Sequence, residues 1–236
     1  MAKQHTFFGL GLLGVLTLSV GLVVILFGGC SKEVVHNGKK VNEWREQLTD
    51  SKVELRREAA QALGEMGENA KPAVPELAAA LKDEDEAVRA LAASALWSIG
   101  PDAAPALPDL CKALKDESVE VRANAAGALG KLGKASRQAA EPLAEALHDS
   151  DPGVRHAAAR SLQNLGPDAR PAVSALIEAL SDSDKAVRAQ AAYTLGEIGP
   201  EARDALPALQ TLAEQKSDGY ARGAATHAIA KIQNDK

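Results

Sequence analysis

One arginine recurs along this chain at an almost constant interval, and this repeat restricts the fold more than any other feature. Five arginines are spaced 33 residues apart, and a sixth follows after 34 residues: Arg56, Arg89, Arg122, Arg155, Arg188 and Arg222. An aspartate precedes each of the first five by six residues: Asp50, Asp83, Asp116, Asp149 and Asp182. A period of this length is typical of a solenoid, in which each unit packs only on its neighbours.

Each unit has the hydrophobic pattern of two helices. In the second unit Val88, Ala92, Leu96 and Ile99 fall at i, i+4, i+8 and i+11, which places them in one apolar stripe of a helix. Asp85 precedes this stripe and is expected to cap the helix N-terminus. A glycine closes the long helix in each of the first five units: Gly67, Gly100, Gly133, Gly166 and Gly199.

A shorter helix is predicted between the long ones, over residues 105–115 of the second unit. The same element precedes the first unit over residues 41–48, where Trp44 takes an inward position. We therefore expect six helix pairs between residues 41 and 233. No sheet is expected, because no stretch alternates with period two. The predicted fold is all-α, a right-handed α-solenoid that forms a single domain over residues 41–236.

The repeated pattern is similar to that of a known family. Asp83–Pro101 and Asp182–Pro200 both read D-x-x-x-x-V-R-x-x-A-A-x-x-L-x-x-I-G-P, which resembles the HEAT repeats of the phycobilisome-lyase-like type. The resemblance extends over about four fifths of the chain. It implies a stack with an extended concave face lined by the second helix of each unit. Because the family includes scaffolds, bilin lyases and a hydroxylase, it does not imply one function.

The N-terminal segment is strongly apolar. Residues 7–29 carry no charge, and Lys3 precedes them. Their length favours a transmembrane anchor, because a signal peptide core is usually shorter, roughly 7–15 residues. However, Phe27–Ser31 resembles a bacterial lipobox, in which Cys30 would receive a lipid. Residues 1–29 are thus expected to be either a signal peptide or an uncleaved membrane anchor.

Both alternatives place the repeats outside the cytoplasmic membrane, because Lys3 holds the N-terminus inside. Residues 30–40 are then a polar tether between the anchor and the repeats. If Cys30 is lipidated, Cys111 is the only thiol left, and we expect it to pack as a small apolar residue.

The sequence shows no constellation typical of an enzyme or a cofactor site. None of the five histidines has metal-ligand spacing, and the His-Glu pairs of the hydroxylase relatives are absent. The arginine and aspartate columns recur in nearly every unit, whereas a catalytic pair is needed once. They are expected to hydrogen-bond between neighbouring repeats. The net charge of -5 argues against nucleic acid as a partner.

The variable positions of the second helices are the best guide to a binding surface. With Val88 central in the buried stripe, a helical wheel points positions 90, 94 and 97 away from the core. These columns change from unit to unit while the core columns stay nearly constant. Small residues at Ala123, Gly127 and Gly130 form a bare floor between larger side chains. The candidate partner-binding residues are Trp97, Gly127, His156, Arg160, Gln163 and Tyr193.

We therefore interpret the chain as a non-catalytic scaffold that holds a protein partner on its concave face, near a membrane. The alternatives are a bilin-lyase-like enzyme or ligand carrier on the same scaffold, and a spacer without a specific partner. In the last case the variable columns are drifting surface positions.

Overall fold

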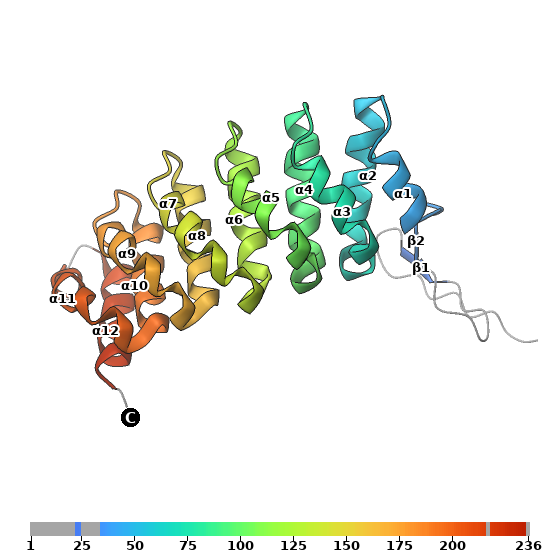
Figure 1. Ribbon diagram of the computed structural model, residues 1–236. Coiled ribbons are helices and arrows are strands. Elements are labelled where there is room, and N and C mark those ends of the chain that lie inside the picture. Colours follow the sequence, from blue (N-terminus) through green and yellow to red (C-terminus); the bar gives the residue numbers. More distant parts are fainter. Residues whose placement is uncertain (1–21, 25–33, 216–217, 235–236) are drawn as a thin grey trace, which may run out of the picture.

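The computed structural model describes residues 22–24, 34–215 and 218–234, which form a single row of stacked helix pairs (Figure 1). The first layer consists of the shorter helices: α1 (Val41–Gln47), α3 (Val74–Ala80), α5 (Leu107–Ala113), α7 (Ala140–Ala146), α9 (Val173–Ala179) and α11 (Leu206–Glu214). The second layer consists of the longer helices: α2 (Val53–Met66), α4 (Glu86–Ile99), α6 (Val119–Lys131), α8 (Pro152–Leu165), α10 (Lys185–Ile198) and α12 (Gly219–Gln233). The prediction of an all-α solenoid with six helix pairs is confirmed.

The core lies between the two layers and consists mostly of alanine and leucine. The paired alanines of the first five units and the leucine after them are fully buried, as Ala92, Ala93 and Leu96 are in α4. Trp44 of α1 is also fully buried, as predicted from its place in the repeat. Small side chains let neighbouring helices approach closely, which explains how a chain with only 3% aromatic residues builds a continuous core.

A glycine ends most long helices and turns the chain into a 3-10 helix. The five glycines have positive φ, between 55° at Gly67 and 76° at Gly199, a backbone region that residues with a Cβ rarely adopt. The 3-10 helices that follow were not predicted: η1 (Gly67–Ala73), η2 (Gly100–Ala106), η3 (Gly133–Ala139), η4 (Gly166–Ala172) and η5 (Gly199–Ala205). Residues 105–115 are consequently not one helix, because η2 covers their start and α5 begins at Leu107.

The arginine columns form a ladder between neighbouring repeats, as predicted. Arg122 donates from Nε to Asp149 of the next repeat at 2.6 Å and from Nη2 to the same carboxylate at 2.9 Å. Its Nη1 donates to the backbone carbonyl of Asp116 at 2.9 Å, in its own repeat. The bidentate rungs pair Arg56 with Asp83, Arg89 with Asp116, Arg122 with Asp149 and Arg155 with Asp182. The last rung pairs Arg188 with Asp218.

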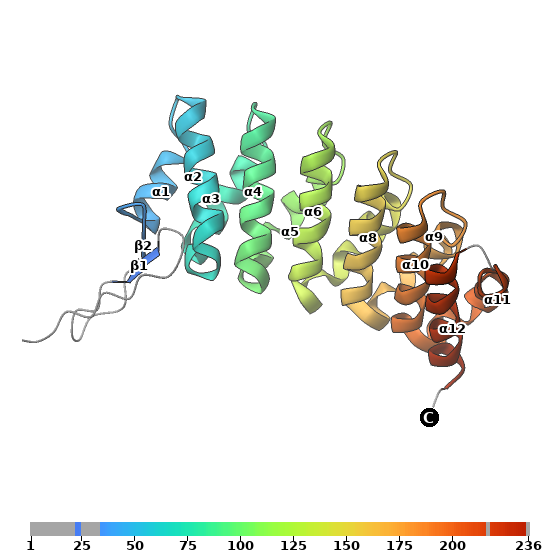
Figure 2. The same ribbon diagram turned by 180° about the vertical axis from the view of Figure 1, so that it is seen from behind.

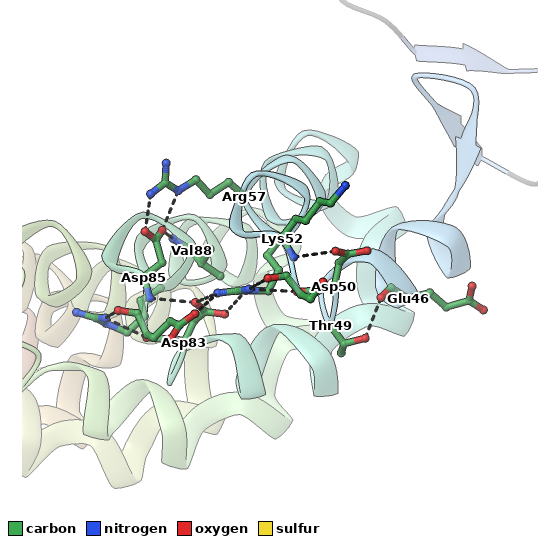
Figure 3. A network of polar contacts seen from close by, with 12 residues as sticks. Glu46, Thr49, Asp50, Lys52, Arg57, Asp83, Asp85 and Val88 are labelled. Carbon is green, nitrogen blue, oxygen red and sulfur yellow. Dashed lines mark hydrogen bonds and ion pairs between the residues drawn. The ribbon is translucent and has the colours of Figure 1, made fainter.

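The aspartates of the ladder also shape the loop that starts each long helix. Asp83 accepts a hydrogen bond from the backbone N–H of Asp85 at 3.0 Å, and Asp85 in turn caps α4 through the N–H of Val88. Figure 3 shows Arg57 reaching from α2 to the same capping carboxylate. Burial raises the pKa of Asp83, but the hydrogen bonds from Arg56 and the loop backbone outweigh it and hold that pKa below its usual value.

A small three-stranded sheet precedes the first repeat, so the expectation of no sheet was wrong. Strand β2 (Val34–His36) pairs with β3 (Lys39–Lys40) across a turn at Asn37 and Gly38, both at positive φ. Asn-Gly is the favoured pair for this two-residue turn, and it was the overlooked signal. Strand β1 (Leu22–Val24) pairs with the other edge of β2.

The hairpin is packed on the first repeat rather than being a free tether. His36 is buried, and its backbone carbonyl accepts a hydrogen bond from the Trp44 indole at 3.2 Å. Its Nε2 lies 2.9 Å from Oε2 of Glu65, although without the alignment of a hydrogen bond. Residues 34–40 therefore belong to the folded domain and cover its first core layer, which corrects their assignment to a polar tether.

Cys30 and most of the apolar leader lie outside the described residues, so their roles as lipidation site and anchor stay predictions. Among the helices of the described part of the chain, none is long and apolar enough to cross a membrane.

Candidate functional site

The second-layer helices line one face of the molecule (Figure 2). Consecutive helices of this layer are in extensive contact, whereas consecutive first-layer helices touch little. A Cβ on Gly196 would lie 3.0 Å from the Cα of Ala228, and a Cβ on Gly130 would collide with the side chain of Ser161. The long helices of the second layer therefore pack closely against one another, and their outward surface is the candidate binding face.

This close spacing corrects part of the helical-wheel prediction. Ala90 and Ala189 are buried, as are Gly130 and Gly196, although all four were expected to point away from the core. The neighbouring second-layer helix covers them. The column of Ser94 is different, because its six members are half-buried or exposed in every repeat.

Trp97 is the most prominent side chain at the centre of this face. It is 44% exposed, although most large apolar side chains of the chain are buried. Its ring lies beside Gly127 of the next helix, where a Cβ would meet Cδ1 of the indole at 3.4 Å. The absence of a side chain at Gly127 therefore provides the space into which the indole extends.

Two open hollows flank the indole of Trp97. The first, about 290 Å³, is lined by Ser94 and Ala123 together with Asn124 and Gly127. The second, about 240 Å³, lies between α6 and α8. Its lining includes Gly127, Lys131, His156, Arg160 and Asn164. Trp97 is a common wall of both hollows, so a bound chain passing over α6 would contact it on either side.

The second hollow carries positive charge. The ammonium group of Lys131 lies 4.9 Å from the centroid of the Trp97 ring, within the range of a cation–π interaction. Arg160 is exposed and His156 half-buried on α8. Neither hollow is lined by a carboxylate, and within the described residues none of these three basic side chains forms an ion pair.

Hydrogen bonds between neighbouring helices hold the floor of the hollows in place. Asn124 donates to the carbonyl of Ala90 at 3.2 Å, and Asn164 donates to that of Gly130 at 3.2 Å. Ser161 donates to the carbonyl of Ala126 at 2.7 Å. These contacts fix the spacing of α4, α6 and α8, so the hollows are preformed.

The structure brings together four of the six predicted site residues: Trp97, Gly127, His156 and Arg160. Gln163 does not line these hollows and accepts a hydrogen bond from Gln190 at 2.8 Å. Tyr193 lies further along, with its ring 6.2 Å from that of Tyr220 and 6.1 Å from that of His227. Together these three rings form a separate aromatic cluster on α10 and α12.

Lys131, Asn124 and Asn164 were missed by the sequence analysis. They flank the three columns taken from the helical wheel, because a face formed by several adjacent helices is wider than the exposed arc of one helix. A helical-wheel analysis that included the positions next to these three would have identified all three residues.

Metal ligands, the thiol of Cys111 and the arginine ladder are the remaining candidates for chemistry. No cluster of three or more potential metal ligands occurs among the described residues. Cys111 is half-buried against the core, and burial raises the pKa of its thiol, which fits a packing residue better than a reactive one. The arginines of the ladder are paired in at least five rungs and hold loops together rather than facing a cleft.

Comparisons with known proteins agree with this architecture. The family model for HEAT repeats matches residues 41–110, 107–173 and 140–230. An engineered protein solved by the Northeast Structural Genomics Consortium is 27% identical, with a TM-score of 0.69 over 81% of this chain and 96% of the other. A designed armadillo repeat protein in complex with the peptide (KR)4 is 20% identical, with a TM-score of 0.70 over 82% of this chain and 100% of the other. The curated proteins gave no match.

Proposed function

Since this chain belongs to the HEAT-repeat family, we propose that it is a non-catalytic scaffold that binds a protein partner on its second-layer face. The observation that carries this function is the exposed indole of Trp97 between two preformed hollows. Tryptophan and arginine are enriched among the residues that dominate binding energy at protein interfaces. The structurally similar designed armadillo protein is in complex with a peptide, which supports a stack of this shape as a peptide-binding surface.

Site-specific photo-crosslinking tests this function. A photoreactive phenylalanine analogue is placed at Ser94, beside Trp97, and in a separate variant at Glu141, which is exposed on the first layer. We expect a discrete crosslinked protein from position 94 and none from position 141, identified by mass spectrometry. Crosslinks from position 141 alone would place the interface on the other layer. An absorption spectrum of the same purified protein would reveal a bound tetrapyrrole, as the ligand-carrier alternative requires.

The scaffold is displayed outside the cytoplasmic membrane under the same proposal, anchored through a lipid on Cys30. The lipobox-like sequence around Cys30 and the apolar leader before it support this location. Cleavage before Cys30 would remove β1 and leave β2 and β3, which are held on the first repeat by the Trp44 and His36 contact. Metabolic labelling with a fatty-acid analogue should label the wild type and not Cys30→Ala. Equal labelling, or none in either, would contradict the lipid anchor.

A further inference from the structure

We infer that the partner segment held beside Trp97 is an acidic peptide that carries an apolar side chain next to its carboxylates. This inference rests on the proposed binding function and adds the chemistry of the partner.

Charge is the first reason. The chain as a whole is acidic, with 32 acidic side chains against 27 lysines and arginines. Many of its basic groups are paired, as the ladder arginines are. Lys131, His156 and Arg160 differ, because they gather around one hollow without a carboxylate partner among the described residues. Such a patch on an acidic surface attracts a ligand whose charge is negative and local.

The position of this patch along the stack limits the size of the ligand. On one side of it, Glu65 lines the hollow between α2 and α4. On the other, Glu197 of α10 is exposed enough to pair with Lys231 at 2.7 Å. The positive region is therefore bounded by carboxylates and extends over α6 and α8 only. A short acidic segment fits this region, whereas a nucleic acid backbone needs positive charge along a longer path.

Shape is the second reason. The hollow lined by Ser94, Ala123 and Gly127 has no charged side chain and adjoins the Trp97 ring, so it suits a single apolar side chain. The charged hollow begins on the other side of the same ring. A bound segment is thus expected to place an apolar residue on one side of the indole and carboxylates on the other.

The binding of synthetic peptides to the full-length chain tests this inference. The probes are a nonapeptide with leucine between two runs of four glutamates, the same peptide with lysines in place of the glutamates, and the acidic peptide with glycine in place of leucine. Each carries a fluorescent label for anisotropy. We expect the acidic leucine peptide to bind with a Kd below about 1 mM, the glycine peptide several-fold more weakly, and the lysine peptide not measurably.

Charge reversal supplies the matched control. The double variant Lys131→Glu, Arg160→Glu should bind the acidic peptide at least ~10-fold more weakly than the wild type. The control, Lys115→Glu, Arg170→Glu, makes the same change in net charge at exposed residues that pair with Glu145 and Glu201. It should leave the affinity within about two-fold. Equal weakening by both variants would show only a long-range charge effect and would overturn the site.

Other results would overturn the inference while leaving the proposed function standing. Binding of the lysine peptide, no binding of the acidic one, or stronger binding of a single-stranded oligonucleotide would each refute the acidic peptide. If position 94 still crosslinks to a protein in that case, the face binds a partner of different chemistry. If position 94 also fails to crosslink, the proposed function fails as well.

Discussion

The ladder between the repeats and the face around Trp97 differ in how far their polar groups are satisfied. In the ladder, Arg122 makes bonds to a carboxylate of the next repeat and to carbonyls of its own. On the face, Arg160 forms no ion pair among the described residues and Trp97 is 44% exposed. The polar groups of the repeated ladder find their hydrogen-bond partners within the protein. Trp97 and Arg160 stand at positions that vary between repeats, and their side chains remain accessible to a partner. The difference separates residues that build the stack from residues available to a partner.

Two adjacent residues of α6 sharpen this comparison most. Ala126 is fully buried in the repeated alanine column, while Gly127 lies on the face. Ala126→Trp should destabilise the protein by about 3 kcal/mol or more, because the closely packed helices leave no space for an indole. A Cβ at Gly127 would contact only the movable Trp97 ring, so Gly127→Trp should cost much less while blocking both hollows. Urea denaturation of the two variants checks the order, and equal losses would contradict it.

A smaller effect is expected from the ladder itself. Arg122→Ala removes a bidentate pair whose side chains are only 12% and 11% exposed, and it should lower stability by about 1–3 kcal/mol. Arg222→Ala should change stability within about 0.5 kcal/mol, because Arg222 is exposed on the last helix. Denaturant melts that rank the two variants the other way would show that the ladder does not join the repeats.

The smallest expected effect is on how the stability of the protein declines at acid pH. The hydrogen bond from Arg57, helped by one from the backbone N–H of Val88, lowers the pKa of Asp85 to about 2. Because the pKa is lower in the folded state, this stabilisation is complete above the unfolded value, about 4, and is lost as the pH falls through about 2. Arg57→Ala should therefore reduce stability at pH 5 and flatten its decline between pH 4 and 2. Urea midpoints at pH 5, 3.5 and 2.5 measure this change, and parallel declines would contradict it.

The sequence was sufficient for the stack and the ladder, because a repeat shows the same side chain in the same environment several times. Hydrogen bonds from the arginines to neighbouring repeats could be predicted for this reason, whereas the structure shows which aspartate each arginine contacts, such as Asp83 for Arg56. The helical wheel was less successful, because one helix does not reveal how closely its neighbour approaches. Gly130 is buried for that reason, although Gly127, three residues earlier on the same helix, is not.

The hairpin at residues 34–40 occurs once, so periodicity carries no information about it. The Asn37-Gly38 pair could have indicated the turn. The two strands, of three and two residues, are too short to show the alternation of apolar and polar side chains that identifies a strand. The grouping of Trp97 with Lys131 depends on contact between α4 and α6, which the repeat fixes only approximately.

The central claim is that the Trp97 face contributes affinity without contributing stability. The direct measurement is the Kd of Trp97→Ala for the protein crosslinked at position 94, compared with the wild type and with Val119→Ala. Val119 is a suitable control because it is 42% exposed and lines neither hollow. We predict a loss of about 2 kcal/mol in binding for Trp97→Ala alone, with the thermal midpoint unchanged in both variants. An unchanged Kd for Trp97→Ala, or a loss matched by Val119→Ala, would contradict the claim.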